Sequence, residues 1–133
     1  MKQSRLLSVL LALALLFGTL LAGDAVFAEE DPIMIGVISP NTGALAAYGT
    51  GIVMGADLAV EEINAAGGIL GREVQLIKTD DQSDPTECLN SFNSLVAKGI
   101  GLIVGSATSG CTSAITDAAN EEGIIQRHAD RYQ

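Results

Sequence analysis

Residues 33–68 read IMIGVISPNTGALAAYGTGIVMGADLAVEEINAAGG and contain two different hydrophobic periods in succession. The first seven residues, Ile33 to Ser39, form a short apolar run that ends at Pro40, which is typical of a buried β-strand. After a loop, a helical pattern continues to about Ala66. Apolar residues recur along it at intervals of three and four, at Ile52, Ala56, Ala59 and Ile63. The closing glycine pair accepts the left-handed backbone that stops a helix.

A second strand and helix follow this first pair. Residues 72–81 (REVQLIKTDD) predict the strand, and Asp84 and Pro85 then supply a capping acid and a proline at the first helical position. Glu87 stands where a capping box needs a side chain that reaches back. The residues expected on the apolar face of this helix are Leu89, Phe92, Leu95 and Val96.

A third strand is predicted over residues 101–106 (GLIVGS) and a third helix over residues 109–122, with Gly123 as its stop. We expect Ile115, Ala118 and Ala119 to face inward from this helix. A fourth strand begins at residues 124–125. Strands that alternate with helices of this length predict an α/β fold with a three-layer parallel sheet and right-handed crossovers. We take the strand order to be 2-1-3 before the start of the fourth strand.

The N-terminus differs in kind from the rest of the chain. Lys2 and Arg5 precede an almost wholly apolar run from Leu6 to Leu21, and AVFA (residues 25–28) offers small residues for cleavage. We therefore expect three parts: a signal peptide over residues 1–28, an incomplete α/β lobe over 29–125, and an aberrant polar tail over 126–133. An uncleaved membrane anchor is the alternative for the first part. Export would place the mature chain in the periplasm or outside the cell.

The charge balance argues against one class of partner. The formal net charge is −9, and the leader holds two of the seven basic residues but only one of the sixteen acidic residues. Beyond the leader the aromatic residues are only Tyr48, Phe92 and Tyr132. An acidic chain without a basic stripe or a stacking platform is a poor match for nucleic acid.

Two loops of the predicted sheet are candidates for a binding site. In open parallel sheets, ligands bind beyond the carboxyl ends of the strands, where the strand order reverses. With the order 2-1-3, the loops after Ser39 and Gly105 face each other there. The second loop offers the hydroxyls of Ser106, Thr108 and Ser109 beside the free backbone N–H groups of a helix start, which attract a carboxylate or phosphate. Ser109 as a simple N-cap without a ligand is the alternative.

Other chemistries find little support in the sequence. GTGIVMG (residues 49–55) has the spacing G-x-G-x-x-x-G and begins ten residues after its strand, so it does not fit a dinucleotide fingerprint. Asp80, Asp81 and Asp84 are expected to be caps and turns, and we expect no metal site. His128 is the only histidine and lies in the tail, so no nucleophile, base and orienter are visible together. We expect no enzyme and no cofactor.

Four motifs together carry a resemblance to a known family. They are GALAAYG at residues 43–49, GADLAVEEINAAGGI at 55–69, DDQSDP at 80–85 and VGSATSG at 104–110. Over about residues 33–125 the chain resembles the branched-chain amino-acid binding proteins of ABC importers, the leucine/isoleucine/valine type of periplasmic binding protein. The resemblance implies the N-terminal lobe of a type I binding protein, an amino acid as ligand and an inner-membrane permease as partner of the full-length protein.

The resemblance also implies roles for particular residues. Ser109 would hold the ligand carboxylate through its hydroxyl and backbone N–H, with Ser106 and Ala107 beside it, and Tyr48 would wall the pocket. A sensor or an amide or urea receptor on the same fold is the alternative function, and a nucleotide-binding enzyme is a remote one.

Cys88 and Cys111 are the only cysteines. Both fall in the first turns of predicted helices on the same sheet face, and an exported protein can form disulfides. A bridge would close a loop of roughly 24 residues and add about 3 kcal/mol. Two separately buried thiols are the alternative, since the Cα separation decides between them. Members of the resembled family can link these two regions, at nearby but not identical positions.

The family pattern stops after EEGII (residues 121–125). The chain then reads QRHADRYQ, and we expect that a buried central strand cannot continue through these polar residues. We therefore expect a truncated or frameshifted product that lacks the second lobe. A single lobe leaves much of a bound ligand exposed to water, so binding is expected to be at best millimolar.

Overall fold

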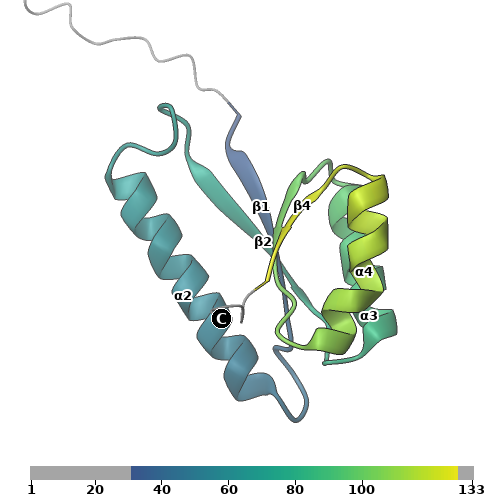
Figure 1. The fold of residues 1–133 in the computed structure, drawn as a ribbon. Coiled ribbons are helices and arrows are strands. Elements are labelled where there is room, and N and C mark those ends of the chain that lie inside the picture. Colours follow the sequence, from purple (N-terminus) through teal and green to yellow (C-terminus); the bar gives the residue numbers. More distant parts are fainter. Residues whose placement is uncertain (1–30, 129–133) are drawn as a thin grey trace, which may run out of the picture. The chain divides into compact units, whose positions relative to one another are not determined.

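The computed structural model describes residues 31–128, and these form a parallel β-sheet with helices on both faces (Figure 1). The predicted signal peptide and the last five residues of the predicted tail lie outside the described residues. In chain order the elements are β1 (Ile33–Ser39), α2 (Ala46–Ala65), β2 (Val74–Asp80), α3 (Pro85–Val96), β3 (Leu102–Val104), α4 (Ser109–Glu121) and β4 (Ile125–Arg127). Among the described residues, no helix is both long and apolar enough to cross a bilayer.

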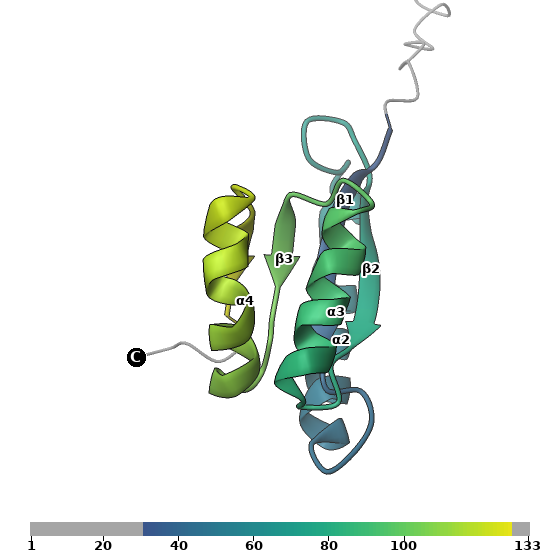
Figure 2. The same ribbon diagram turned by 90° about the vertical axis from the view of Figure 1, so that its right-hand side faces the viewer.

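The four strands are all parallel and lie in the order β2-β1-β3-β4, which confirms the predicted order. The central strand β1 pairs with β2 from Ile33↔Val74 to Ser39↔Asp80, and with β3 at Gly36↔Ile103 and Val37↔Val104. Helix α2 covers one face of the sheet, whereas α3 and α4 cover the other (Figures 1 and 2). The chain therefore leaves β1 and β3, which are neighbours, toward opposite faces, as it does at a topological switch point.

The fourth strand extends farther than expected. Gln126 and Arg127 belong to β4 and pair with Ile103 and Val104 of β3. The sequence was expected to exclude a buried central strand beyond Ile125, and β4 is instead an edge strand of the described sheet. Ile125 is 67% exposed. An edge strand with one neighbour and open faces tolerates polar side chains that a central strand would exclude.

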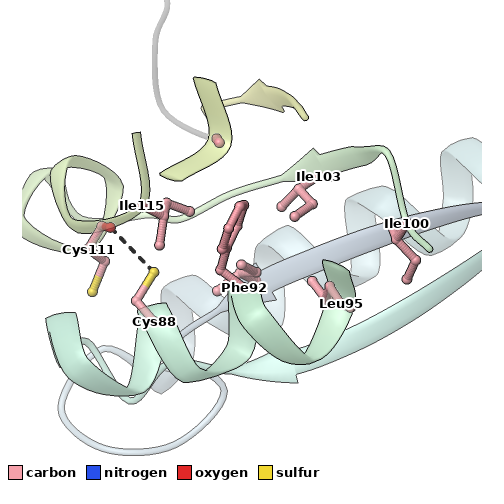
Figure 3. Close-up of a cluster of buried hydrophobic side chains, with 9 residues drawn as sticks. Cys88, Phe92, Leu95, Ile100, Ile103, Cys111 and Ile115 are labelled. Atoms are coloured by element: carbon pink, nitrogen blue, oxygen red, sulfur yellow. Dashed lines mark hydrogen bonds between the residues drawn. The ribbon is translucent and has the colours of Figure 1, made fainter. Parts of the chain in front are cut away.

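The hydrophobic core lies between the sheet and the α3–α4 pair (Figure 3). Its members include Phe92, Leu95, Ile103 and Ile115, all of them at most 1% exposed. Leu89, which the sequence placed on this face, is instead 36% exposed, and the neighbouring Cys88 is fully buried. The inner face of α3 thus follows the spacing 88, 92 and 95, which is rotated by one residue from the expected face at its first turn.

The other sheet face is covered less completely. Helix α2 contacts β1 and β2 among the described residues. Its expected apolar residues do face the sheet, but they line an open cavity of about 770 Å³ and not a closed core. From α2 these lining residues include Ile52, Ala56, Ala59 and Ile63, and from the sheet they include Ile35, Val37, Leu76 and Val104.

Candidate functional site

The loop between β1 and α2 is held by a carboxylate from the neighbouring strand. Asp80, the last residue of β2, accepts hydrogen bonds through Oδ1 from the backbone N–H of Asn41 at 2.8 Å and of Thr42 at 3.3 Å. Its Oδ2 accepts from the Thr42 hydroxyl at 2.6 Å. The side chain of Asn41 in turn donates to the backbone carbonyl of Thr79 at 3.3 Å. The carboxyl end of β2 therefore fixes the course of this loop.

The same hydrogen bonds set the charge state of Asp80. Desolvation acts to raise its pKa, but hydrogen bonds from Thr42, Gln82 and Asn41 outweigh that effect and hold the pKa below its ordinary value. Asp80 therefore stays ionised and keeps all its acceptor sites near neutral pH. Gln82 lies two residues farther along the chain, in the turn that follows β2, and its backbone N–H donates to Oδ1 of Asp80 with an N···O distance of 3.0 Å. Asp80 was expected as a turn residue, but its hydrogen bonds to the loop after β1 were not predicted.

Tyr48 lies in the first turn of α2 and is 70% exposed. The helix start packs tightly on the preceding loop, because a Cβ atom at Gly49 would lie 2.0 Å from the carbonyl oxygen of Pro40. Tyr48 borders the cavity beneath α2, together with Arg127 and His128. An exposed phenol side chain therefore forms part of the wall of a mainly apolar cavity.

The loop after β3 begins with a close contact between backbones. Gly105 has a φ of +124°, and a Cβ atom there would lie 2.0 Å from the carbonyl oxygen of Ile38, so only glycine fits. Ser106 follows and is fully buried. Its hydroxyl donates to Oδ2 of Asp81, which is itself fully buried, and Asp81 Oδ1 accepts from the N–H of Ser83 at 2.9 Å. Ser106 thus ties the β3 loop to the end of β2.

The N-termini of α3 and α4 are capped differently. Asp84 caps α3 by accepting from the N–H groups of Thr86 at 2.8 Å and Glu87 at 3.1 Å, and these bonds, that to Glu87 first, lower its pKa. This confirms the predicted cap. Thr108 holds the N-cap position of α4, but its side chain makes no capping hydrogen bond. The first N–H groups of α4 therefore lack the side-chain acceptor that α3 has.

The polar groups around the start of α4 differ in accessibility. Ser109 is the first helical residue and is exposed, and Ala107 is half-buried. The alternative of Ser109 as N-cap is wrong, because Thr108 occupies that position. The Thr108 hydroxyl is buried without a hydrogen-bond partner among residues 31–128. An exposed hydroxyl and uncapped backbone N–H groups at a helix start form an anion-accepting end.

The two candidate loops share one edge of the sheet, because they follow the adjacent parallel strands β1 and β3. Tyr48 borders the cavity beneath α2, and Ser109 is not among the residues that line that cavity. The structure brings Ser106 to Asp81 and leaves the side chains of Ser109 and Tyr48 exposed.

A buried cluster lies behind the β3 loop. The thiol sulfurs of Cys88 and Cys111 and a carboxylate oxygen of Asp81 all lie within 4.8 Å of one another. All three residues are fully buried, and both cysteines are free thiols. Burial raises the pKa of the Cys88 thiol, with further contributions from Cys111 and Asp81. The two cysteines were predicted to lie on helices of the same sheet face, but the proximity of Asp81 to them was not predicted.

The chain is similar in sequence to known periplasmic binding proteins. A family model described as periplasmic binding protein matches residues 32–126. The Leu/Ile/Val-binding protein BraC3 of Rhizobium johnstonii is 43% identical over 93 residues, which is 70% of this chain and 25% of the relative. The Leu/Ile/Val-binding protein of Escherichia coli K12 is 35% identical over 112 residues, or 84% of this chain and 30% of that protein.

Solved structures of binding proteins are similar to this chain as well. The branched-chain amino acid transporter substrate binding protein LivJ from Streptococcus pneumoniae, in complex with isoleucine, superposes with a TM-score of 0.73 at 38% identity. That match covers 77% of this chain and 30% of LivJ. The leucine binding protein LivK of Thermotoga maritima has a TM-score of 0.67 at 30% identity, over 72% of this chain and 27% of LivK. The chain thus spans 25–30% of the length of these relatives.

Proposed function

The chain belongs to the periplasmic binding protein family, and from this premise we propose that it contributes the N-terminal lobe of an extracytoplasmic receptor for a branched-chain or related amino acid. The receptor would deliver its ligand to the permease of an ABC importer. The relatives named for leucine, isoleucine and valine binding, and the isoleucine complex of LivJ, support this ligand class. The proposed role is capture and release of a solute, not catalysis.

The start of α4 carries this proposal. An amino acid at neutral pH has a carboxylate, and the first N–H groups of α4 lack a side-chain cap among the described residues. The carboxylate would take the place that Asp84 fills for α3 and would also accept from the exposed Ser109 hydroxyl. Ala107 beside it leaves space for the ligand to approach.

Ser106 and Tyr48 would act differently from Ser109. The Ser106 hydroxyl is buried and already donates to Asp81, so we assign it a positioning role for the loop and not a contact with the ligand. Tyr48 stands exposed at the same edge of the sheet, where its ring can cover an apolar side chain. The cavity beneath α2 is lined mainly by apolar side chains, so we assign the ligand head group to the start of α4.

The test is an NMR titration of the full ¹⁵N-labelled chain with L-leucine. We expect millimolar binding, with the amide signals of Ser109 and Gly110 shifting most. Leucinol lacks the carboxylate and should leave these signals unchanged. Ser109→Ala should weaken binding by roughly fivefold or more, because one hydrogen bond to a charged group is lost.

Ser113→Ala is the matched control, since Ser113 is exposed on the same helix one turn farther on. It should bind leucine as the unmodified chain does. Equal shifts with leucine and leucinol, or shifts confined to the cavity beneath α2, would contradict the assignment of the carboxylate to the start of α4.

A further inference from the structure

Two buried thiols lie side by side at the start of the neighbouring helices α3 and α4 (Figure 3). The Cys88 and Cys111 sulfurs are within 4.8 Å of each other, and the Cys88 thiol donates to the backbone carbonyl of Cys111 at 3.4 Å. Neither side chain is exposed. Each thiol therefore has the other as its immediate neighbour in a site closed to solvent.

The first turns of the two helices lie close together. A Cβ atom at Gly110, next to Cys111, would lie 3.8 Å from Cγ of Pro85 at the start of α3. A disulfide needs its sulfurs about 2.05 Å apart. Rotation about the Cα–Cβ bonds changes the separation of the two sulfurs.

We propose that Cys88 and Cys111 form an intramolecular disulfide when the chain folds in the presence of an oxidised thiol compound. The thiolate of one cysteine attacks a sulfur of oxidised glutathione, which forms a mixed disulfide and releases one reduced glutathione. The second cysteine loses its proton, attacks the protein sulfur of that mixed disulfide and releases the second glutathione. Two protein thiols are thereby oxidised, and one glutathione disulfide is reduced to two thiols.

The bond would fix the loop between β3 and α4. This loop is already tied to the end of β2, because Ser106 donates to Asp81. Cys111 lies two residues after Ser109 in the first turn of α4. A covalent link from there to α3 would hold the start of α4 against the start of α3, and it would do so whether or not the loop binds a ligand.

The timing of oxidation follows from burial. The folded Cys88 thiol has a raised pKa because it is desolvated and lies near Cys111 and Asp81. A protonated, enclosed thiol reacts slowly with an external disulfide. The cross-link should therefore form readily during refolding and slowly once the reduced protein has folded.

The experiment refolds the full chain from denaturant with either oxidised or reduced glutathione. Alkylation and intact mass spectrometry then count the free thiols. We expect no free thiol and a mass lower by two hydrogens after oxidative refolding, and Tm higher by roughly 10 °C than in the reduced protein. A reductant should reverse the Tm difference. Peptide mapping should recover one linked pair that contains Cys88 and Cys111.

The double variant Cys88→Ala/Cys111→Ala is the control, and its Tm should be the same under both conditions. Should it fail to fold, peptide mapping of the unmodified chain still decides. Two alkylated thiols after oxidative refolding, a disulfide only between chains, or one bound Zn²⁺ per chain with both cysteines reduced would each overturn the proposal. None of these measurements involves an amino acid, so failure here is separate from failure of the proposed ligand site.

Discussion

Asp80, at the end of β2, holds the hydroxyl of Thr42 in the loop after β1, with 2.6 Å between Oδ2 and Oγ1. The same carboxylate accepts the backbone N–H groups of Asn41 and Thr42. One side chain thus joins two strand ends at the edge of the sheet where parallel α/β proteins bind ligands. The position of the β1 loop, and with it the start of α2, depends on this ionised group.

Replacing Asp80 with Asn should destabilise the protein. The amide nitrogen cannot accept the hydrogen bonds that the second carboxylate oxygen accepts, and the remaining acceptor is uncharged. We expect a loss of about 1 to 2 kcal/mol in the free energy of unfolding at pH 7, measured by urea denaturation. Asp57→Asn is the control, because Asp57 pairs with Lys78 at 2.5 Å with both side chains well exposed. Its loss should stay below about 0.5 kcal/mol.

Stability should also fall in acid. The pKa values of Asp80 and Asp84 are lowered in the folded protein, so each carboxylate contributes stability above the ordinary aspartate pKa of about 3.9. That contribution is lost as the pH falls through the lowered folded pKa. Urea midpoints measured from pH 7 down to pH 2 should decline less in Asp80→Asn than in the unmodified chain. Parallel curves for the two proteins would show that Asp80 does not titrate in this way.

Ser106→Ala tests the link between the β3 loop and β2. The substitution removes the hydrogen-bond donor to Oδ2 of Asp81, and that carboxylate is fully buried. We expect a loss of about 1 to 3 kcal/mol in the free energy of unfolding, since a buried acceptor is left with one partner fewer. Ser94→Ala, on the exposed side of α3, should change stability by less than about 0.5 kcal/mol.

Two glycines of α2 should respond in opposite directions to alanine. A Cβ atom at Gly49 would overlap the Pro40 carbonyl, whereas a Cβ atom at Gly51 would meet no described atom within 4 Å apart from its chain neighbours and the backbone of its own helix. Gly49→Ala should therefore lower Tm strongly, because loop or helix must move. Gly51→Ala should raise Tm, because alanine favours the helix and adds up to about 1 kcal/mol to the free energy of unfolding. Thermal unfolding followed by circular dichroism compares them, and equal shifts would contradict the packing described for Gly49.

The sequence predicted most of the fold because the residues that begin and end its strands and helices act locally. Pro40 ends β1, and Asp84 followed by Pro85 begins α3, where the structure has them. The alternation of strands and helices predicted the parallel sheet, and the order 2-1-3 assumed for it is the order found. The inner face of α3 was off by one residue at its start, since Cys88 and Leu89 both suit an apolar face and only the packing of α4 decides between them.

The candidate site was less predictable than the fold. Three hydroxyl residues follow β3, and their order along the chain does not say which way each points. The close approach of Gly105 to β1 turns Ser106 inward to Asp81, while Ser109 starts the helix in solvent. Asp80 could be identified as a turn residue, but its bonds to Asn41 and Thr42 depend on the alignment of strands that are 38 residues or more apart in sequence.

Helix α2 is held by few contacts, and this affects where the protein unfolds first. It starts without a side-chain cap, touches only β1 and β2 among the described residues, and stands over a hollow. Its outer side leaves Met54 and Leu58 more than half exposed. Few buried contacts mean a low free energy of local unfolding. The backbone amides of α2 should therefore exchange with deuterium sooner than those of α3, and a protease should cut this segment before the rest of the fold.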